Sequence, residues 1–124
     1  MDLELSSEQE ALRDEFRRML TAVCDHDTRR AAIDSPGAVD RKLWEQLVNT
    51  GLFSLGLPEA QGGLGSGMAE MVIVHEEIGR AAVPGPVAVT SALAPHLPGV
   101  PDGSVIASAL YEGDPPFIIE HLEG

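Results

Sequence analysis

The chain has 124 residues, enough for one domain with a modest core but too few for two full domains. Its formal net charge of −12 disfavours binding to nucleic acids and to anionic membrane surfaces. The only cysteine, Cys24, excludes a disulfide within the chain, and no apolar run is long enough to cross a bilayer. The N-terminus is acidic, unlike a signal peptide, so we expect a cytoplasmic protein without membrane insertion.

The first predicted element is an amphipathic helix over about residues 7–27. Ser7 and Glu10 have the Ser-x-x-Glu spacing of a capping box, which satisfies backbone N–H groups at a helix start. Apolar side chains then recur on one helical face, with charged residues between them. They are Leu12, Phe16, Met19, Leu20 and Val23. Residues 29–39 have no sustained apolar period, so the sequence predicts a connector there.

A second helix is predicted from Asp40, a favourable N-cap residue, to Gly51, which stands in the place of a C-terminal glycine. Its apolar stripe consists of Leu43, Trp44, Leu47 and Val48. Residues 52–67 alternate apolar residues with turn formers, and Pro58 and the glycines exclude a regular helix. We therefore expect a loop that its apolar side chains hold against the core.

A third helix is predicted over about residues 66–79, with its apolar stripe facing the core. The stripe consists of Met68, Met71, Val72, His75 and Ile78. Glu70, Glu76, Glu77 and Arg80 are expected outside it. Two prolines then break the chain, and a fourth helix over about residues 87–96 is rich in small side chains. Small residues permit close backbone approach or leave space beside the helix.

After residue 97 the sequence changes from helical patterns to a boundary followed by strand-like patterns. Residues 98–103 hold two prolines and two glycines, which indicates a boundary. Residues 104–111 are typical of a strand, and residues 117–119 of a second short one. Two strands do not form a stable sheet alone. The predicted fold is thus an all-α orthogonal bundle of about four helices over residues 1–102, followed by one or two strands of an incomplete β domain over residues 103–124.

No constellation of residues predicts chemistry by itself. The four histidines, His26, His75, His96 and His121, lack a second ligand at metal-binding spacing, so no metal site is expected. The glycine-rich residues 62–65 lack the Gly-Lys-Ser/Thr ending of a phosphate-binding loop. Both these glycines and the Glu76-Glu77 pair are compatible with purely architectural roles.

Four sequence segments, taken together, indicate a protein family more specifically than any of these single motifs does. Residues 6–13 read Ser-Ser-Glu-Gln-Glu-Ala-Leu-Arg, and residues 44–52 form a Trp-x-x-Leu helix that ends in Gly-Leu. Residues 57–65 read Leu-Pro-Glu-Ala-Gln-Gly-Gly-Leu-Gly, and residues 76–81 read Glu-Glu-Ile-Gly-Arg-Ala. In this order and spacing they resemble the N-terminal helical domain of the acyl-CoA dehydrogenases. The resemblance covers residues 3 to about 111.

The resemblance implies part of an FAD-dependent oxidoreductase that α,β-dehydrogenates acyl-CoA thioesters. It places most FAD contacts and the catalytic base in a central β domain, a C-terminal bundle and a neighbouring subunit, so no catalytic residue is expected in this chain. It implies that small residues of the fourth helix line the acyl pocket: Val87, Ala88, Val89, Thr90, Ala92 and Leu93. Tyr111 and Glu112 fall at the family's flavin contact, where Tyr111 replaces a threonine.

Three functions follow from these observations. The chain is the N-terminal part of a complete acyl-CoA dehydrogenase, a short or degenerate subunit that pairs with a longer dehydrogenase chain in an oligomer, or an unrelated acidic interaction module. The four-segment resemblance argues against the third. The first two predict an apolar patch left exposed where the missing domains of the enzyme would lie. They also predict that the isolated chain binds FAD weakly or not at all and is inactive.

Overall fold

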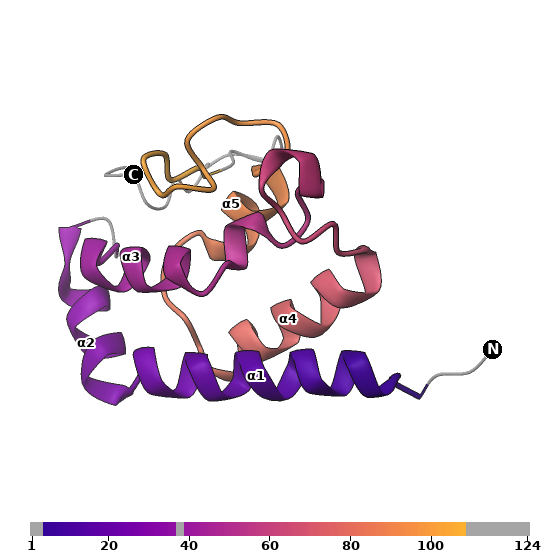
Figure 1. Cartoon of the computed structure of the whole chain (residues 1–124). Helices are drawn as coiled ribbons and strands as arrows, with labels where there is room; N and C mark the ends of the chain where they lie inside the picture. Colours follow the sequence, from indigo (N-terminus) through magenta and orange to yellow (C-terminus); the bar gives the residue numbers. More distant parts are fainter. Residues whose placement is uncertain (1–3, 37–38, 109–124) are drawn as a thin grey trace, which may run out of the picture.

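The computed structural model describes residues 4–36 and 39–108 (Figure 1). These residues form five α-helices and two 3₁₀ turns, without a strand, which confirms the all-α class for this part of the chain. The elements are α1 (Ser7–Val23), α2 (His26–Asp34), α3 (Arg41–Asn49), η2 (Leu52–Ser54), η3 (Glu59–Gln61), α4 (Met68–Arg80) and α5 (Val87–Leu93). None of the described helices has the length and apolarity that a membrane crossing requires.

Helix α1 begins at Ser7, and its N-cap is Ser6, one residue before the predicted cap. The Ser6 hydroxyl accepts a hydrogen bond from the Gln9 backbone N–H at 3.2 Å, and the Gln9 side chain accepts one from the Ser6 N–H at 3.1 Å. The predicted Ser7–Glu10 pair is therefore wrong by one position, because two adjacent serines compete and glutamine replaces glutamate equally well. The predicted stripe is correct in its buried members, Phe16 and Leu20.

Helix α2 lies where the sequence predicted the end of the first helix and a connector. The chain leaves α1 after Val23, and the Asp25 carboxylate caps a new helix by accepting from the Thr28 N–H at 2.8 Å. Arg29 fixes this bend by donating to the carbonyls of Cys24 at 2.6 Å and Ala81 at 3.2 Å. The prediction failed because α2 buries one small side chain, Ala32, which gives no apolar period.

Helix α3 and the loop after it follow the prediction. The Asp40 carboxylate caps α3 by accepting from the N–H groups of Lys42 and Leu43. Gly51 adopts a left-handed φ of 82° that a residue with a side chain would adopt only under strain. The following loop is held against the core by four buried side chains: Leu52, Phe53, Leu55 and Leu57. The Trp44 and Phe53 rings stack with centroids 4.9 Å apart.

Helix α4 lies beside α1 (Figure 1), but with a different face toward the core than predicted. Ile73, Val74 and Glu77 are buried, whereas Met68 and Val72 are 79% and 50% exposed. The helix is apolar on two sides, so two stripes compete for the core and the period alone does not choose between them. Of the predicted stripe, only Ile78 is buried outright.

Helix α5 is shorter than predicted, ending at Leu93. The segment after it returns to the core, because Ile106 and Ala107 are buried and the Thr90 hydroxyl donates to the Ala107 carbonyl at 2.6 Å. Residues 104–108 form no strand among the described residues. The rest of the first predicted strand and the whole second one lie outside the described residues, so the incomplete β domain and its boundary stay predictions.

Candidate functional site

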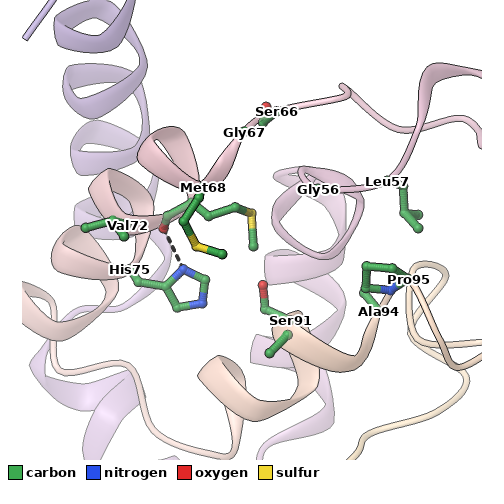
Figure 2. A pocket seen from close by; sticks show the side chains of 12 residues that line it. Gly56, Leu57, Ser66, Gly67, Met68, Val72, His75, Ser91, Ala94 and Pro95 are labelled. Carbon is green, nitrogen blue, oxygen red and sulfur yellow. Dashed lines mark hydrogen bonds between the residues drawn. The ribbon is translucent and has the colours of Figure 1, made fainter.

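A pocket of about 420 Å³ opens between α4, α5 and the segment before η3 (Figure 2). This volume lies in the range of small-ligand sites. Backbone and apolar side chains make up most of its wall. The lining residues are Gly56, Leu57, Ser66, Gly67, Met68, Met71, Val72, His75, Ser91, Ala92, Ala94 and Pro95.

The α4 side of the pocket is apolar and accessible. Met68 and Val72, the exposed residues of the predicted stripe, lie there with half-buried Met71. A Cβ added at Gly56 would lie 3.4 Å from the Met71 sulfur, so the Gly56 backbone lies directly against the Met71 side chain at this end of the pocket. Methionines adapt their shape to varied ligands, and clustered exposed apolar side chains mark binding surfaces. The wall therefore suits an apolar ligand group.

Three polar side chains line this otherwise apolar space: Ser66 in the loop before α4, His75 on α4 and Ser91 on α5. His75 Nδ1 lies 2.7 Å from the Met71 carbonyl oxygen, and because a carbonyl only accepts, the ring donates through Nδ1. The Ser91 side chain is 3% exposed, and its hydroxyl has no hydrogen-bond partner among the described residues. In Figure 2 the Ser91 hydroxyl points into the pocket opposite α4, the helix that carries His75.

Helix α5 brings one of the six predicted substrate-binding residues, Ala92, to the pocket wall. Ala88 is exposed, and Val89 and Leu93 are half-buried away from the lining. Val87 and Thr90 are buried behind the wall, where they support the helix. The predicted flavin contacts Tyr111 and Glu112 lie outside the described residues.

Sequence reasoning missed the residues that contribute most to the wall. Met68, Met71, Val72 and His75 were recognised as one helical stripe but assigned to the core. Ser91 was passed over because a serine within a small-residue helix gives no signal of its burial. Met68 and Val72 expose apolar surface here, while the apolar patch that the sequence predicted where other domains would lie stays a prediction.

The glycine-rich loop does not fit a phosphate group of FAD or CoA. Its N–H groups donate inward: Gly62 to the Glu59 carbonyl at 3.0 Å, Gly63 to Pro58 at 3.1 Å, and Gly65 to Leu57 at 2.8 Å. A phosphate-binding loop needs free N–H groups aimed at the ligand. At Gly63 an added Cβ would lie 2.1 Å from the Leu57 carbonyl oxygen. The glycines therefore allow the chain to turn tightly.

Glu77 connects α1 and α4 from a buried position, where the sequence had expected an exposed residue. Its carboxylate accepts from Arg17 at 2.7 and 3.0 Å and from Arg80 at 2.6 Å, and the residue is 4% exposed. The hydrogen bonds from Arg17, followed by those from Arg80, lower the pKa of Glu77 to about 2. A carboxylate this strongly held is a poor general base. No cluster of potential metal ligands occurs among the described residues.

Comparison with protein families supplies the identification. The family model for the acyl-CoA dehydrogenase N-terminal domain matches residues 6–98. The chain belongs to the acyl-CoA dehydrogenase family. The family match spans the four segments on which the sequence resemblance rested.

Individual relatives of this acyl-CoA dehydrogenase domain are enzymes from bacteria. Acyl-CoA dehydrogenase IpdE2 of Mycolicibacterium smegmatis is 35% identical over 83 residues, which cover 66% of this chain and 27% of the relative. Benzylmalonyl-CoA dehydrogenase of Aromatoleum aromaticum is 33% identical over 84 residues, covering 64% and 21%. The chain thus spans about a quarter of the length of these curated relatives.

Solved structures of the family share the fold. The ChsE4-ChsE5 complex from Mycobacterium tuberculosis superposes with a TM-score of 0.66 at 27% identity, over 86% of this chain and 30% of the other. A variant of the Tcur3481-Tcur3483 steroid ACAD superposes with a TM-score of 0.64 at 35% identity, over 78% and 30%. In the acyl-CoA dehydrogenase domain described here, two of the recognised motifs, the glycine loop and the Glu77-Arg80 pair, have architectural contacts.

Proposed function

We propose that this chain is the N-terminal part of a flavin-dependent enzyme that α,β-dehydrogenates acyl-CoA thioesters, and that its α4–α5 pocket helps to wall the acyl chain. One observation carries the proposal: in a chain of this family, Met68 and Val72 expose apolar surface into a pocket of about 420 Å³. Exposure of such side chains to water is unfavourable unless a ligand or another part of the protein covers them.

The net charge of the chain is consistent with a role in binding the acyl end of the substrate rather than its CoA phosphates. A net charge of −12 disfavours the CoA phosphates, and the glycine loop has no free N–H groups for them. The pocket instead suits the uncharged acyl end of the thioester. Ala92 would contact this group directly, and Val87, Ala88, Val89, Thr90 and Leu93 would set the position of α5.

In such an enzyme the hydride acceptor is FAD. We propose that the residues that hold FAD lie mainly in a central β domain, a C-terminal bundle and a neighbouring subunit, with Tyr111 and Glu112 as candidate contacts from this chain. We assign no catalytic residue to the described part of the chain. The isolated chain is therefore expected to be inactive and to bind FAD weakly or not at all. Its place of action is expected to be the cytoplasm.

A second arrangement has specific support. Both similar structures are named for two components, ChsE4-ChsE5 and Tcur3481-Tcur3483. This chain corresponds to 30% of the matched chain in each case. The alternative proposal is that it is a short, non-catalytic subunit that completes the acyl pocket of a longer dehydrogenase chain within an oligomer. Its pocket-lining role would be the same.

The test uses visible absorbance and acyl-CoA titration. The chain is purified alone and again from its source with whatever protein it accompanies, and each sample is titrated with acyl-CoA thioesters without oxygen. The proposal predicts no flavin on the chain alone, and a flavin that is bleached by acyl-CoA in the complete assembly. Stoichiometric flavin on the isolated chain would overturn the proposal that FAD is held mainly by residues outside this chain. If no acyl-CoA changes the visible absorbance of the flavin in the complete assembly, the proposed reaction is overturned.

A further inference from the structure

We propose that Ser91 and His75 bind a hydroxyl group carried by the acyl portion of the substrate, away from the thioester. The inference rests on the proposed function, because it takes the α4–α5 pocket as the acyl site. It goes further by naming a chemical feature of the substrate and the two side chains that recognise it. Apart from Ser66 in the loop before α4, the remaining side chains of the wall are apolar, and His75 and Ser91 are the polar side chains on the two helices that flank the pocket.

The first observation is the state of Ser91. Its side chain is 3% exposed, and its hydroxyl has no partner among the described residues, not even the carbonyl one turn earlier on α5. Buried hydroxyls in folded proteins are nearly always hydrogen-bonded, so an orphan needs a reason. The hydroxyl points into the pocket (Figure 2). A ligand oxygen that displaces the side chains covering this buried hydroxyl would satisfy it.

The second observation is the tautomer of His75. Because Nδ1 donates to the Met71 carbonyl at 2.7 Å, the neutral ring carries its proton there and presents a lone pair at Nε2. The backbone bond also fixes the ring orientation on the pocket side of α4 (Figure 2). His75 therefore offers an acceptor, whereas Ser91 on α5 offers a donor and an acceptor.

These groups together match a hydroxyl better than other substituents. A hydroxyl both donates and accepts, so it supplies the donor that His75 Nε2 lacks and the partner that Ser91 Oγ lacks. A keto oxygen only accepts and leaves Nε2 without a donor, and a methyl group leaves both unsatisfied. No lysine or arginine lines the pocket, so a carboxylate or phosphate would lack a counter-charge.

The experiment uses the complete flavin-containing assembly and a matched pair of medium-chain acyl-CoA thioesters, one ending in a methyl group and one in a hydroxyl. The dissociation constant of each is measured from the change in flavin absorbance without oxygen. The expected result is about tenfold tighter binding of the hydroxyl-ended thioester. Ser91→Ala and His75→Phe should each remove most of this preference. The control Ser35→Ala, in a serine whose hydroxyl bonds the Ala31 carbonyl on α2, should retain it.

The outcomes separate this inference from the proposed function. If both thioesters bind and bleach the flavin with equal affinity, the acyl site stands and the Ser91–His75 proposal is overturned, with water as the partner of Ser91. If Ser91→Ala and His75→Phe both keep the preference for the hydroxyl-ended thioester, another group binds the hydroxyl and the proposal is also wrong. If neither thioester affects the flavin, the proposed function fails and the inference falls with it.

Discussion

The two faces of α4 show how one helix serves both fold and ligand. The closed face, formed by Ile73, Val74 and Glu77, has its apolar groups buried and its carboxylate held by two arginines. The open face, formed by Met68, Val72 and His75, leaves apolar surface and one ring nitrogen directed to a pocket. Where internal partners satisfy every group, the residues stabilise the domain. Where groups are left without them, the residues are available to a ligand.

The largest effect is expected in the loop that leads into α4. Gly63→Ala would place a Cβ 2.1 Å from the Leu57 carbonyl oxygen, and because that neighbour is backbone the turn itself would have to distort. We expect a loss of more than about 4 kcal/mol in unfolding free energy, measured by urea denaturation. Gly79→Ala is the control, since a Cβ there meets nothing within 4 Å. It should leave stability unchanged or raise it by up to about 1 kcal/mol. Equal effects would refute the steric argument.

The charge on the closed face is the next test. Glu77→Gln removes the negative charge and replaces one of the two oxygens that accept from Arg17 and Arg80 with an N–H donor. It should cost about 2–3 kcal/mol, less than for a fully buried pair because both arginines are half-exposed. Glu76→Gln, one position along and exposed, should change stability by less than about 0.5 kcal/mol. Thermal denaturation of both variants measures the difference. Similar melting temperatures for the two would contradict a structural role of Glu77.

A matched pair of valines compares the faces directly. Val74→Ala on the closed face should cost about 2 kcal/mol, because it leaves a cavity in the core. Val72→Ala on the open face should cost less than about 0.5 kcal/mol, because the side chain is half-exposed. Chemical denaturation gives both values. A reversed order would show that the predicted stripe, and not the observed one, faces the core.

The smallest effect is a pH dependence. The pKa of Glu77 is lowered from its ordinary value of 4.5 to about 2, so the folded state favours the ionised carboxylate. Its stabilising contribution is complete above pH 4.5 and declines as the pH falls toward 2. The stability difference between the wild type and Glu77→Gln should therefore shrink over this interval. A difference that stays constant from pH 7 to pH 3 would disprove the linkage.

The sequence predicted both ends of α3 better than the orientation of α4. Asp40 and Gly51 act through local backbone geometry, which short motifs encode, and both were placed correctly. The face of α4 depends on which of two apolar stripes α1 covers, and only the tertiary contact decides this. Helix α2 was missed because Ala32 buries too little surface to produce a period. The pocket was predicted on α5, yet most of its wall comes from α4 and the backbone near Gly56.

The most direct test of the central claim, that the open face of α4 and α5 receives the acyl chain, is Ala92→Phe in the complete assembly. Ala92 lines the pocket and is exposed, so a phenyl ring fills the pocket without disturbing the core. The account predicts that KM for a long-chain acyl-CoA rises at least about tenfold while that for a short-chain one changes little. Unchanged kinetics for the long chain would show that the acyl group binds elsewhere and would contradict the account.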